Sequence, residues 1–143
     1  MRISIVCFQR NRNAALEAAE QEYLKRLSRH AEIELVPVKR WDEQTGVPAR
    51  LLQAQRLVAL SAEGRRWDSE GLAGRLQQLM NQGCSHLVLV IGGPKGMPTR
   101  AAAQAQECWS LSSLTFSHQL ARLLLLEVLY RSFDLLQGGR YHK

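Results

Sequence analysis

The sequence predicts an α/β fold with a mainly parallel sheet and helices on both faces. Short apolar segments alternate with longer segments of helical periodicity, in the order β-α-β-α-β-α-β-α-β-α. The segment 86–91 is almost continuously apolar and ends in glycines, which is typical of a strand covered on both faces. With 143 residues and neither an internal repeat nor a linker, we expect one domain spanning residues 1–143.

The N-terminal part is expected to form a strand, a helix and a second strand. Apolar residues over 3–8 indicate the first strand. The asparagines of 11–13 are able to cap the following helix, whose apolar stripe extends over 16–27. Residues 31–35 alternate between apolar and polar, and Pro37 indicates that this strand lies at an edge of the sheet.

The middle of the chain is predicted to continue the alternation. We expect, in order, a polar loop over 39–48, a short helix over 49–55, a buried strand over 57–60, a turn over 61–66, and a helix capped by Asp68 or Ser69. Gly83 is expected to end that helix, because glycine adopts the left-handed conformation that closes many helices.

Two predicted strand ends contain residues suited to a ligand. The strand 86–91 runs into the glycine-rich segment 92–96, and a second candidate strand over 109–116 ends in hydroxyl-bearing residues. Open parallel sheets bind ligands beyond the carboxyl ends of their strands. Apolar side chains and hydroxyls without charge suit a neutral adenosine better than a triphosphate. An ordinary half-buried strand followed by a Ser117 helix cap would account for the same residues.

Other kinds of site are not indicated. The glycine spacing of 92–96 matches neither the dinucleotide nor the P-loop pattern, so a nucleotide-phosphate enzyme is disfavoured. No metal-ligand spacing, paired carboxylates or Ser-His-Asp order stands out, and the three cysteines are too far apart to indicate a zinc site or a disulfide framework. His118, at a helix start, is more typical of a structural than a catalytic histidine.

The charge favours an anionic partner. Nineteen Lys and Arg against thirteen Asp and Glu give a net charge of +6, and the isoelectric point is about 9.7. Nucleic acid is the commonest partner of a basic domain, although charge spread over both halves of the chain is also typical of a solvated surface. No apolar run approaches the roughly 20 residues of a membrane span, and no signal-peptide layout is present, so we expect a cytoplasmic protein.

The last helix, over 118–136, is apolar on most of its circumference, which indicates burial on more than one side. In so small a domain a second subunit is the expected cover. Arg122 projects away from the side of the helix that carries Arg131, so we expect one of the two arginines to face a pocket or the partner subunit. The alternative is that both lie on ordinary solvent-exposed edges of the helix. The tail 138–143 combines an aromatic ring, an imidazole and two cations suited to RNA, although short polar tails usually fray.

Several segments match those of a known family in order and spacing. They are 91–96, 111–120, Arg122, Glu127 with 129–131, and the terminal Tyr141-His142-Lys143. With these segments the chain resembles the RlmH family, densely over 57–143 and more weakly before. RlmH proteins are SPOUT-class methyltransferases that methylate N3 of a pseudouridine in 23S ribosomal RNA. The resemblance implies a trefoil knot in the C-terminal half, a homodimer, and S-adenosylmethionine as cofactor.

The resemblance also implies which residues form the site. The implied cofactor contacts are Leu60, Gly92, Leu111, Ser112, Ser113, Leu114, Thr115 and Phe116. The implied catalytic residues are Tyr141 and His142, which a homodimer would allow to complete the partner's pocket. The expected RNA contacts are Lys95, Arg122, Arg131, Arg140 and Lys143. Ribosomal RNA, free or in the assembled ribosome, is the expected partner, and neither a metal nor a membrane is expected.

The chain also departs from the family pattern. Ser61 follows Leu60 where an acidic residue is usual, and Phe8-Gln9 replaces a usual Gly-Lys pair. The segment before Leu57 is shorter, which leaves only a stub of the expected helix. These differences keep a second reading open, in which the chain is a non-catalytic RNA-binding module on the same knotted fold.

Overall fold

The computed structural model describes residues 1–8, 13–40, 42–93 and 95–142. In this part of the chain five strands form one parallel sheet in the order β2-β1-β4-β3-β5. The strands are β1 (Arg2–Cys7), β2 (Glu32–Pro37), β3 (Arg56–Arg66), β4 (His86–Ile91) and β5 (Glu107–Ser110). The helices are α1 (Ala14–Leu27), the 3-10 turn η1 (Ala49–Leu51), α2 (Ser69–Asn81), α3 (Thr99–Gln104) and α4 (His118–Leu136).

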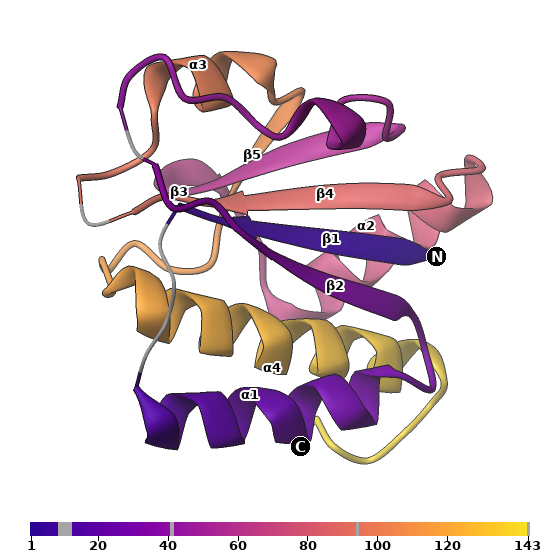
Figure 1. The fold of residues 1–143 in the computed structure, drawn as a ribbon. Coiled ribbons are helices and arrows are strands. Elements are labelled where there is room, and N and C mark those ends of the chain that lie inside the picture. Colours follow the sequence, from indigo (N-terminus) through magenta and orange to yellow (C-terminus); the bar gives the residue numbers. More distant parts are fainter. Residues whose placement is uncertain (9–12, 41, 94, 143) are drawn as a thin grey trace.

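Helices cover both faces of the sheet, as the sequence predicted (Figure 1). On one face α1, α2 and α4 pack together, and their apolar side chains, such as Leu76 and Leu126, meet those of β1 and β4 in the larger core. On the other face η1, α3 and the segment between β2 and η1 enclose a smaller core around Val88 and Val90. The predicted edge position of β2 is confirmed.

The helix caps follow the sequence. Asn13 accepts hydrogen bonds from the backbone N–H of Ala15 and Leu16. Asp68 caps α2 by accepting from the Gly71 N–H, and Gly83 has the expected left-handed φ of 86°. The cap residues therefore fix where each helix begins or ends before any tertiary contact is considered.

Three predicted elements were wrong in their extent. The helix expected over 49–55 is a single 3-10 turn, in agreement with the expected stub. The turn expected over 61–66 is a continuation of β3, which pairs again with β5 after a register shift between Leu60 and Arg65. At Gly64 the two strands are so close that an added Cβ would lie 2.7 Å from the Cys108 carbonyl carbon.

The strand expected over 109–116 ends at Ser110. Beyond it, side-chain hydroxyls take the place of ladder hydrogen bonds. The Ser110 hydroxyl donates to the Ser112 carbonyl oxygen at 2.8 Å, and Ser112 Oγ accepts from the Leu114 N–H at 3.0 Å. Such local bonds compete with strand pairing, so residues 111–116 form a loop at the carboxyl end of the sheet.

Candidate functional site

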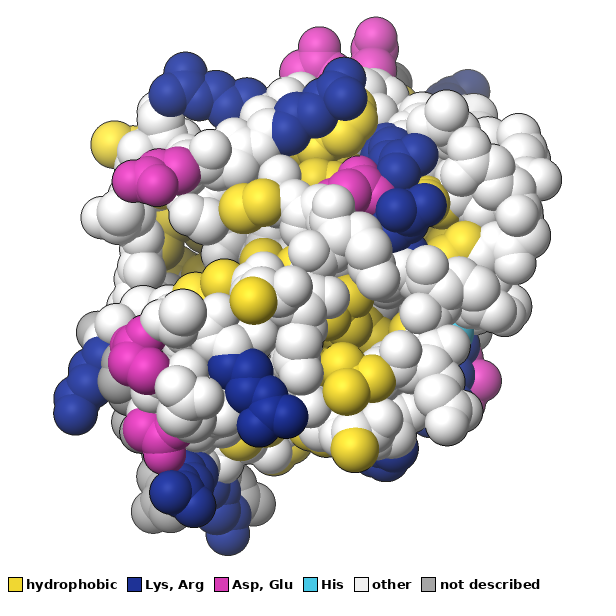
Figure 2. Space-filling view, turned by 90° about the horizontal axis from the view of Figure 1, so that it is seen from above, with side chains coloured by type: hydrophobic (Ala, Val, Ile, Leu, Met, Phe, Trp, Pro, Cys, Tyr) yellow, Lys and Arg dark blue, Asp and Glu magenta, His cyan; other side chains and the backbone are white. Residues whose placement is uncertain are grey.

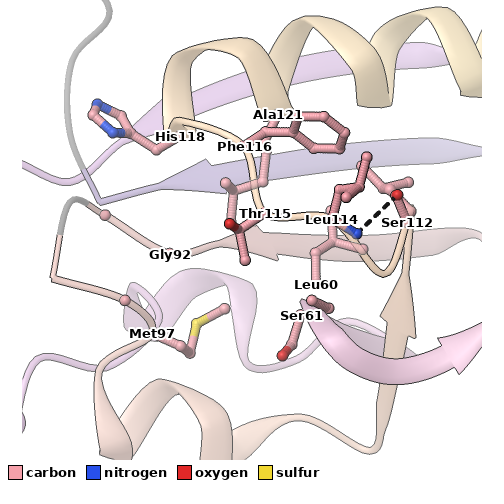
Figure 3. Close-up of a pocket in the computed structure, with 15 residues that line it drawn as sticks. Leu60, Ser61, Gly92, Met97, Ser112, Leu114, Thr115, Phe116, His118 and Ala121 are labelled. Carbon is pink, nitrogen blue, oxygen red and sulfur yellow. Dashed lines mark hydrogen bonds between the residues drawn. The ribbon is translucent and has the colours of Figure 1, made fainter.

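A cleft lies at the carboxyl end of β4, beside the middle of β3, where the pairing of β3 with β4 ends at Leu60 and Ile91. Its volume is about 260 Å³. The middle of β3, the loops after β4 and β5, and the start of α4 form its walls. Figure 3 shows Leu60 and Ser61 on one side with Thr115 and Phe116 across from them. Gly92 and Met97 lie at its far end.

The structure brings most of the predicted cofactor residues into this one cleft. Ser113 alone of the eight is outside the lining. The seven that line the cleft are Leu60, Gly92, Leu111, Ser112, Leu114, Thr115 and Phe116. They come from three segments that are far apart in the sequence. The order of the strands in the sheet is what brings them together.

The glycine segment forms a tight turn. Gly93 and Gly96 exchange two backbone hydrogen bonds, both 2.9 Å long, and Gly96 has a φ of 93°. A Cβ on Gly92 would lie 2.8 Å from the Gly96 carbonyl carbon. Glycine is therefore required here by the fold of the turn, which presents backbone groups to the cleft.

The cleft is uncharged. Among the residues described, its lining contains hydroxyls, glycines and apolar side chains but no Asp, Glu, Lys or Arg. At its rim, Leu114 is 69% exposed, Phe116 39% and the neighbouring Leu120 37%. Large apolar side chains at this level of exposure indicate a surface that is covered when the site is complete.

His118 lines the cleft, although the sequence interpretation treated it as structural. Burial, and then the charge of Arg122, lower the pKa of His118, so its imidazole is neutral near pH 7. Its Nε2 is buried and has no hydrogen-bond partner in the described part of the chain. The signal in the sequence was its place directly after the hydroxyl-rich segment, at the start of the helix that closes the cleft.

The predicted catalytic residues do not lie in this cleft. The Tyr141 hydroxyl donates to Glu127 at 3.0 Å and lies 3.0 Å from the Tyr23 hydroxyl. Burial, followed by these hydrogen bonds, raises the pKa of Tyr141, which keeps it protonated. Arg131 Nη1 lies 3.0 Å from His142 Nδ1. Because arginine only donates, Nδ1 is the acceptor and the proton of the neutral ring is on Nε2.

The predicted RNA contacts are in different environments. Lys95 and Arg140 are exposed, and Lys143 lies outside the described residues. Arg131 is paired with Glu127, and its side chain is 26% exposed. Arg122 is buried, at 9% side-chain exposure, in an ion pair with Glu20 at 3.0 Å. Its prediction as an RNA contact therefore needs correction, because a buried and paired guanidinium does not reach phosphates.

The basic side chains are dispersed on the face of the molecule that Figure 2 shows. On the face shown in Figure 2, Lys and Arg side chains form several separate groups with exposed hydrophobic side chains between them. No cluster of His, Cys, Asp and Glu able to hold a metal occurs among the described residues. In the same part of the chain no helix is both long and apolar enough to cross a bilayer.

Comparison with known proteins agrees with this architecture. A family model described as "Predicted SPOUT methyltransferase" matches residues 1–142. Three similar proteins are each called "Ribosomal RNA large subunit methyltransferase H". Those from Acetivibrio thermocellus and an Anaeromyxobacter species are each 36% identical over the whole of both chains. That from Rubrobacter xylanophilus is 40% identical over 99% of this chain and 98% of its own.

These matches extend over essentially the whole chain, so they include the loops of the cleft and the C-terminal tail as well as the sheet. The parallel five-stranded sheet with helices on both faces is consistent with the knotted SPOUT fold that the resemblance implied. The chain therefore belongs to the SPOUT methyltransferase family.

Proposed function

We propose that this protein methylates N3 of a pseudouridine in large-subunit ribosomal RNA, with S-adenosylmethionine as donor. The observation that carries the proposal is the uncharged cleft, whose hydroxyls and glycine turn lie at the strand ends of a SPOUT methyltransferase. The names of the relatives give ribosomal RNA as their substrate. The pseudouridine and its N3 atom come from the resemblance to the RlmH family.

The residues of the cleft fit this donor. A sulfonium cation is repelled by Lys or Arg, and the described lining contains neither. A neutral His118 adds no positive charge. Leu60, Leu111 and Phe116 are suited to the adenine, while the hydroxyls of Ser112 and Thr115 and the backbone of Gly92 are suited to its polar edges.

The protein's part in the transfer is alignment and proton acceptance. S-adenosylmethionine, when bound, supplies an electrophilic methyl group. The one O–H of Tyr141 is donated to Glu127 in this structure, so Tyr141 is suited to orient the target base through stacking on its aromatic ring. His142 can take the N3 proton at Nδ1 only after this atom leaves the Arg131 N–H, because its one lone pair accepts that hydrogen bond in this structure. Rate enhancement then comes mainly from proximity and exclusion of water.

This mechanism requires a homodimer. His118 lies in the cleft and Arg131 at the tail, and thirteen helical residues separate them by about 20 Å at roughly 1.5 Å per residue. A tail held beside Arg131 does not serve its own cleft, so we propose that it serves the cleft of a second copy. The exposed apolar rim of Leu114 and Phe116 is the surface such a copy would cover. The expected place of action is the cytoplasm.

The test is methyl transfer from labelled S-adenosylmethionine to ribosomes from a strain that lacks the modification. Transfer is expected with the wild type. His142→Ala should bind the donor with unchanged affinity by calorimetry and transfer the methyl group at least about 100-fold more slowly, as general base catalysis contributes about that much. Absence of transfer by the wild type at every salt concentration would reject the proposal.

The alternative is a non-catalytic RNA-binding module on the same fold. The observation that favours it is the reduced segment before β3, where a single 3-10 turn stands for the expected helix. This alternative predicts RNA binding without any heat from S-adenosylmethionine. Donor calorimetry therefore separates the two readings before any RNA is prepared.

A further inference from the structure

The continuation of β3 leads away from the cleft to a second concave surface. Ser61 and Ala62 line the cleft, and the same strand then runs on to Arg66 beside β5. At its end the guanidinium carbon of Arg65 lies 4.0 Å from the ring centroid of Trp67. The two surfaces are thus connected by six residues of one strand.

This second surface is a groove of about 470 Å³, which we call the α2 groove. Arg65 and Trp67 form one wall, and Arg75 and Gln78 of α2 lie in the other. Between them α2 presents glycine at two positions, and at Gly74 an added Cβ would meet nothing within 4 Å. The groove therefore has an open, bare stretch of helix between polar walls.

The walls of the groove are fixed in place. Trp67 packs edge-on against the buried Trp109, with ring centroids 6.2 Å apart. Arg75 makes two hydrogen bonds to the Glu107 carboxylate, at 2.5 and 3.2 Å. Because the Arg65 guanidinium is held over a ring that is itself packed, little conformational entropy remains to be lost when a ligand binds.

The charge of the groove is positive. Glu107 is the single carboxylate among the described residues of its lining, and it is shared by Arg75 and by Arg56 at 3.4 Å. Arg65 belongs to the same lining and makes no ion pair among the described residues, and Arg66 next to it is exposed. An anion with planar groups is the ligand that this combination fits.

We infer that the α2 groove binds the ribosomal RNA strand that flanks the target nucleotide. Single-stranded RNA is recognised by arginines that contact phosphates and by aromatic rings or guanidinium planes on which bases stack. The groove offers both and is joined to the methylation cleft by one strand. This inference rests on the proposed function, and it assigns RNA binding to Arg65 and Trp67 of the groove lining and to the exposed Arg66 beside the groove. These residues lie outside the set expected from the sequence.

The test measures binding of a fluorescein-labelled rRNA fragment containing the target loop by anisotropy over a range of salt. The double variant Arg65→Gln/Arg66→Gln should bind about 10-fold more weakly, and its salt slope should be smaller by roughly 1 to 2. Arg29→Gln, which changes an exposed arginine in the turn after α1, is the control and should behave as the wild type. Donor affinity by calorimetry should be unchanged in both.

A second pair of variants removes doubt about folding. Gly74→Glu and Gly74→Gln both replace a helix glycine by a better helix former, but only the first adds a negative charge to the groove. Gly74→Glu should weaken RNA binding about 10-fold relative to Gly74→Gln, because the carboxylate repels phosphates. Equal RNA affinity of these two variants would overturn the inference.

The outcomes also separate this inference from the proposed function. Suppose that the wild type transfers methyl groups and that the Arg65/Arg66 variant binds the protein-free RNA fragment with the same affinity as the control. The groove is then not an RNA site. The same holds if the variant is defective only on assembled ribosomes, since the groove would then contact a ribosomal protein. If the wild type binds RNA through the groove but takes no donor, the proposed function fails and the groove stands.

Discussion

Arg122 shows how much the role of one residue depends on its neighbours. In the sequence it is one of the residues that match the family and an expected RNA contact, but in the structure it pairs with Glu20 across the contact between α1 and α4. Both side chains are almost fully buried, at 9% and 3% exposure. Burial raises the pKa of the nearby Cys7 thiol to about 11, although Arg122 opposes this, so the thiol stays protonated.

Glu20→Gln tests this ion pair. The change leaves the Arg122 charge buried without its partner, so the free energy of unfolding in urea should fall by about 3–5 kcal/mol. Glu17→Gln, on an exposed position of the same helix, should change it by less than about 0.5 kcal/mol. A loss of under 1 kcal/mol in Glu20→Gln would mean that Arg122 finds water or another partner.

His118 gives the cleft a pH dependence. Its lowered pKa keeps it neutral near pH 7, and protonation below its ordinary value of 6.5 places a positive charge beside the sulfonium. Two charges about 4 Å apart in water repel by about 1 kcal/mol, so donor affinity should fall by about 5-fold as the pH is lowered through that range. In His118→Gln the affinity should be independent of pH between about 5 and 7. A parallel fall in both proteins would assign the titration to another group.

At the scale of elements, the continuation of β3 decides the shape of the site. Without it, residues 61–66 would be a surface turn, as the sequence predicted. With it, Ser61 and Ala62 are held in the cleft lining and Arg65 reaches the α2 groove. The continuation is possible because Gly64 lets β3 pass close to Cys108 of β5.

Gly64→Ala tests that close approach. The added methyl group meets the β5 backbone at 2.7 Å, so unfolding stability should fall by about 1–3 kcal/mol, and donor affinity should fall with it. Gly74→Ala is the matched control, because its Cβ has open space and should raise stability by up to about 1 kcal/mol through helix propensity. Thermal unfolding measures the change in stability, and calorimetry measures the change in donor affinity. Equal changes in stability for Gly64→Ala and Gly74→Ala would contradict the packing argument.

At the scale of the whole molecule, one chain holds the cleft and the tail apart. The tail returns from the end of α4 towards α1 (Figure 1), and Tyr141 contacts Tyr23 of α1 and Asp134 of α4. The cleft is lined by the opposite end of α4, at His118 and Ala121. A symmetric dimer resolves this separation, because each copy can then supply its tail to the other. The particle in solution should accordingly have twice the mass of the 16.2 kDa chain.

Mixed dimers test where the tail acts. A chain carrying His142→Ala and a chain carrying Gly92→Val, whose side chain closes the cleft turn, should each be inactive alone. Co-expressed, they should recover about a quarter of wild-type transfer, since half of randomly formed dimers are mixed and one of their two sites is intact. A tail acting on its own cleft predicts no recovery in the mixture.

The sequence was sufficient for the local features of this fold. Asn13, Asp68 and Gly83 marked helix ends correctly, because capping depends on hydrogen bonds within a few residues. The buried strand 86–91 was also predicted correctly, because a strand covered on two faces is apolar at nearly every position. The edge strand was predicted correctly from Pro37, because proline has no N–H to donate to a neighbouring strand. The family resemblance was confirmed by relatives 36–40% identical.

Only the tertiary structure decided how these elements meet. Residues 61–66 become strand or turn according to whether β5 lies within hydrogen-bonding reach, and Arg122 is buried because α1 brings Glu20 opposite it. The convergence of seven predicted cofactor residues from three segments likewise depends on strand order. The physical reason is the same in each case, since caps and apolar patterns act between near neighbours, whereas pairing, ion pairing and cleft formation depend on partners that the sequence places far away.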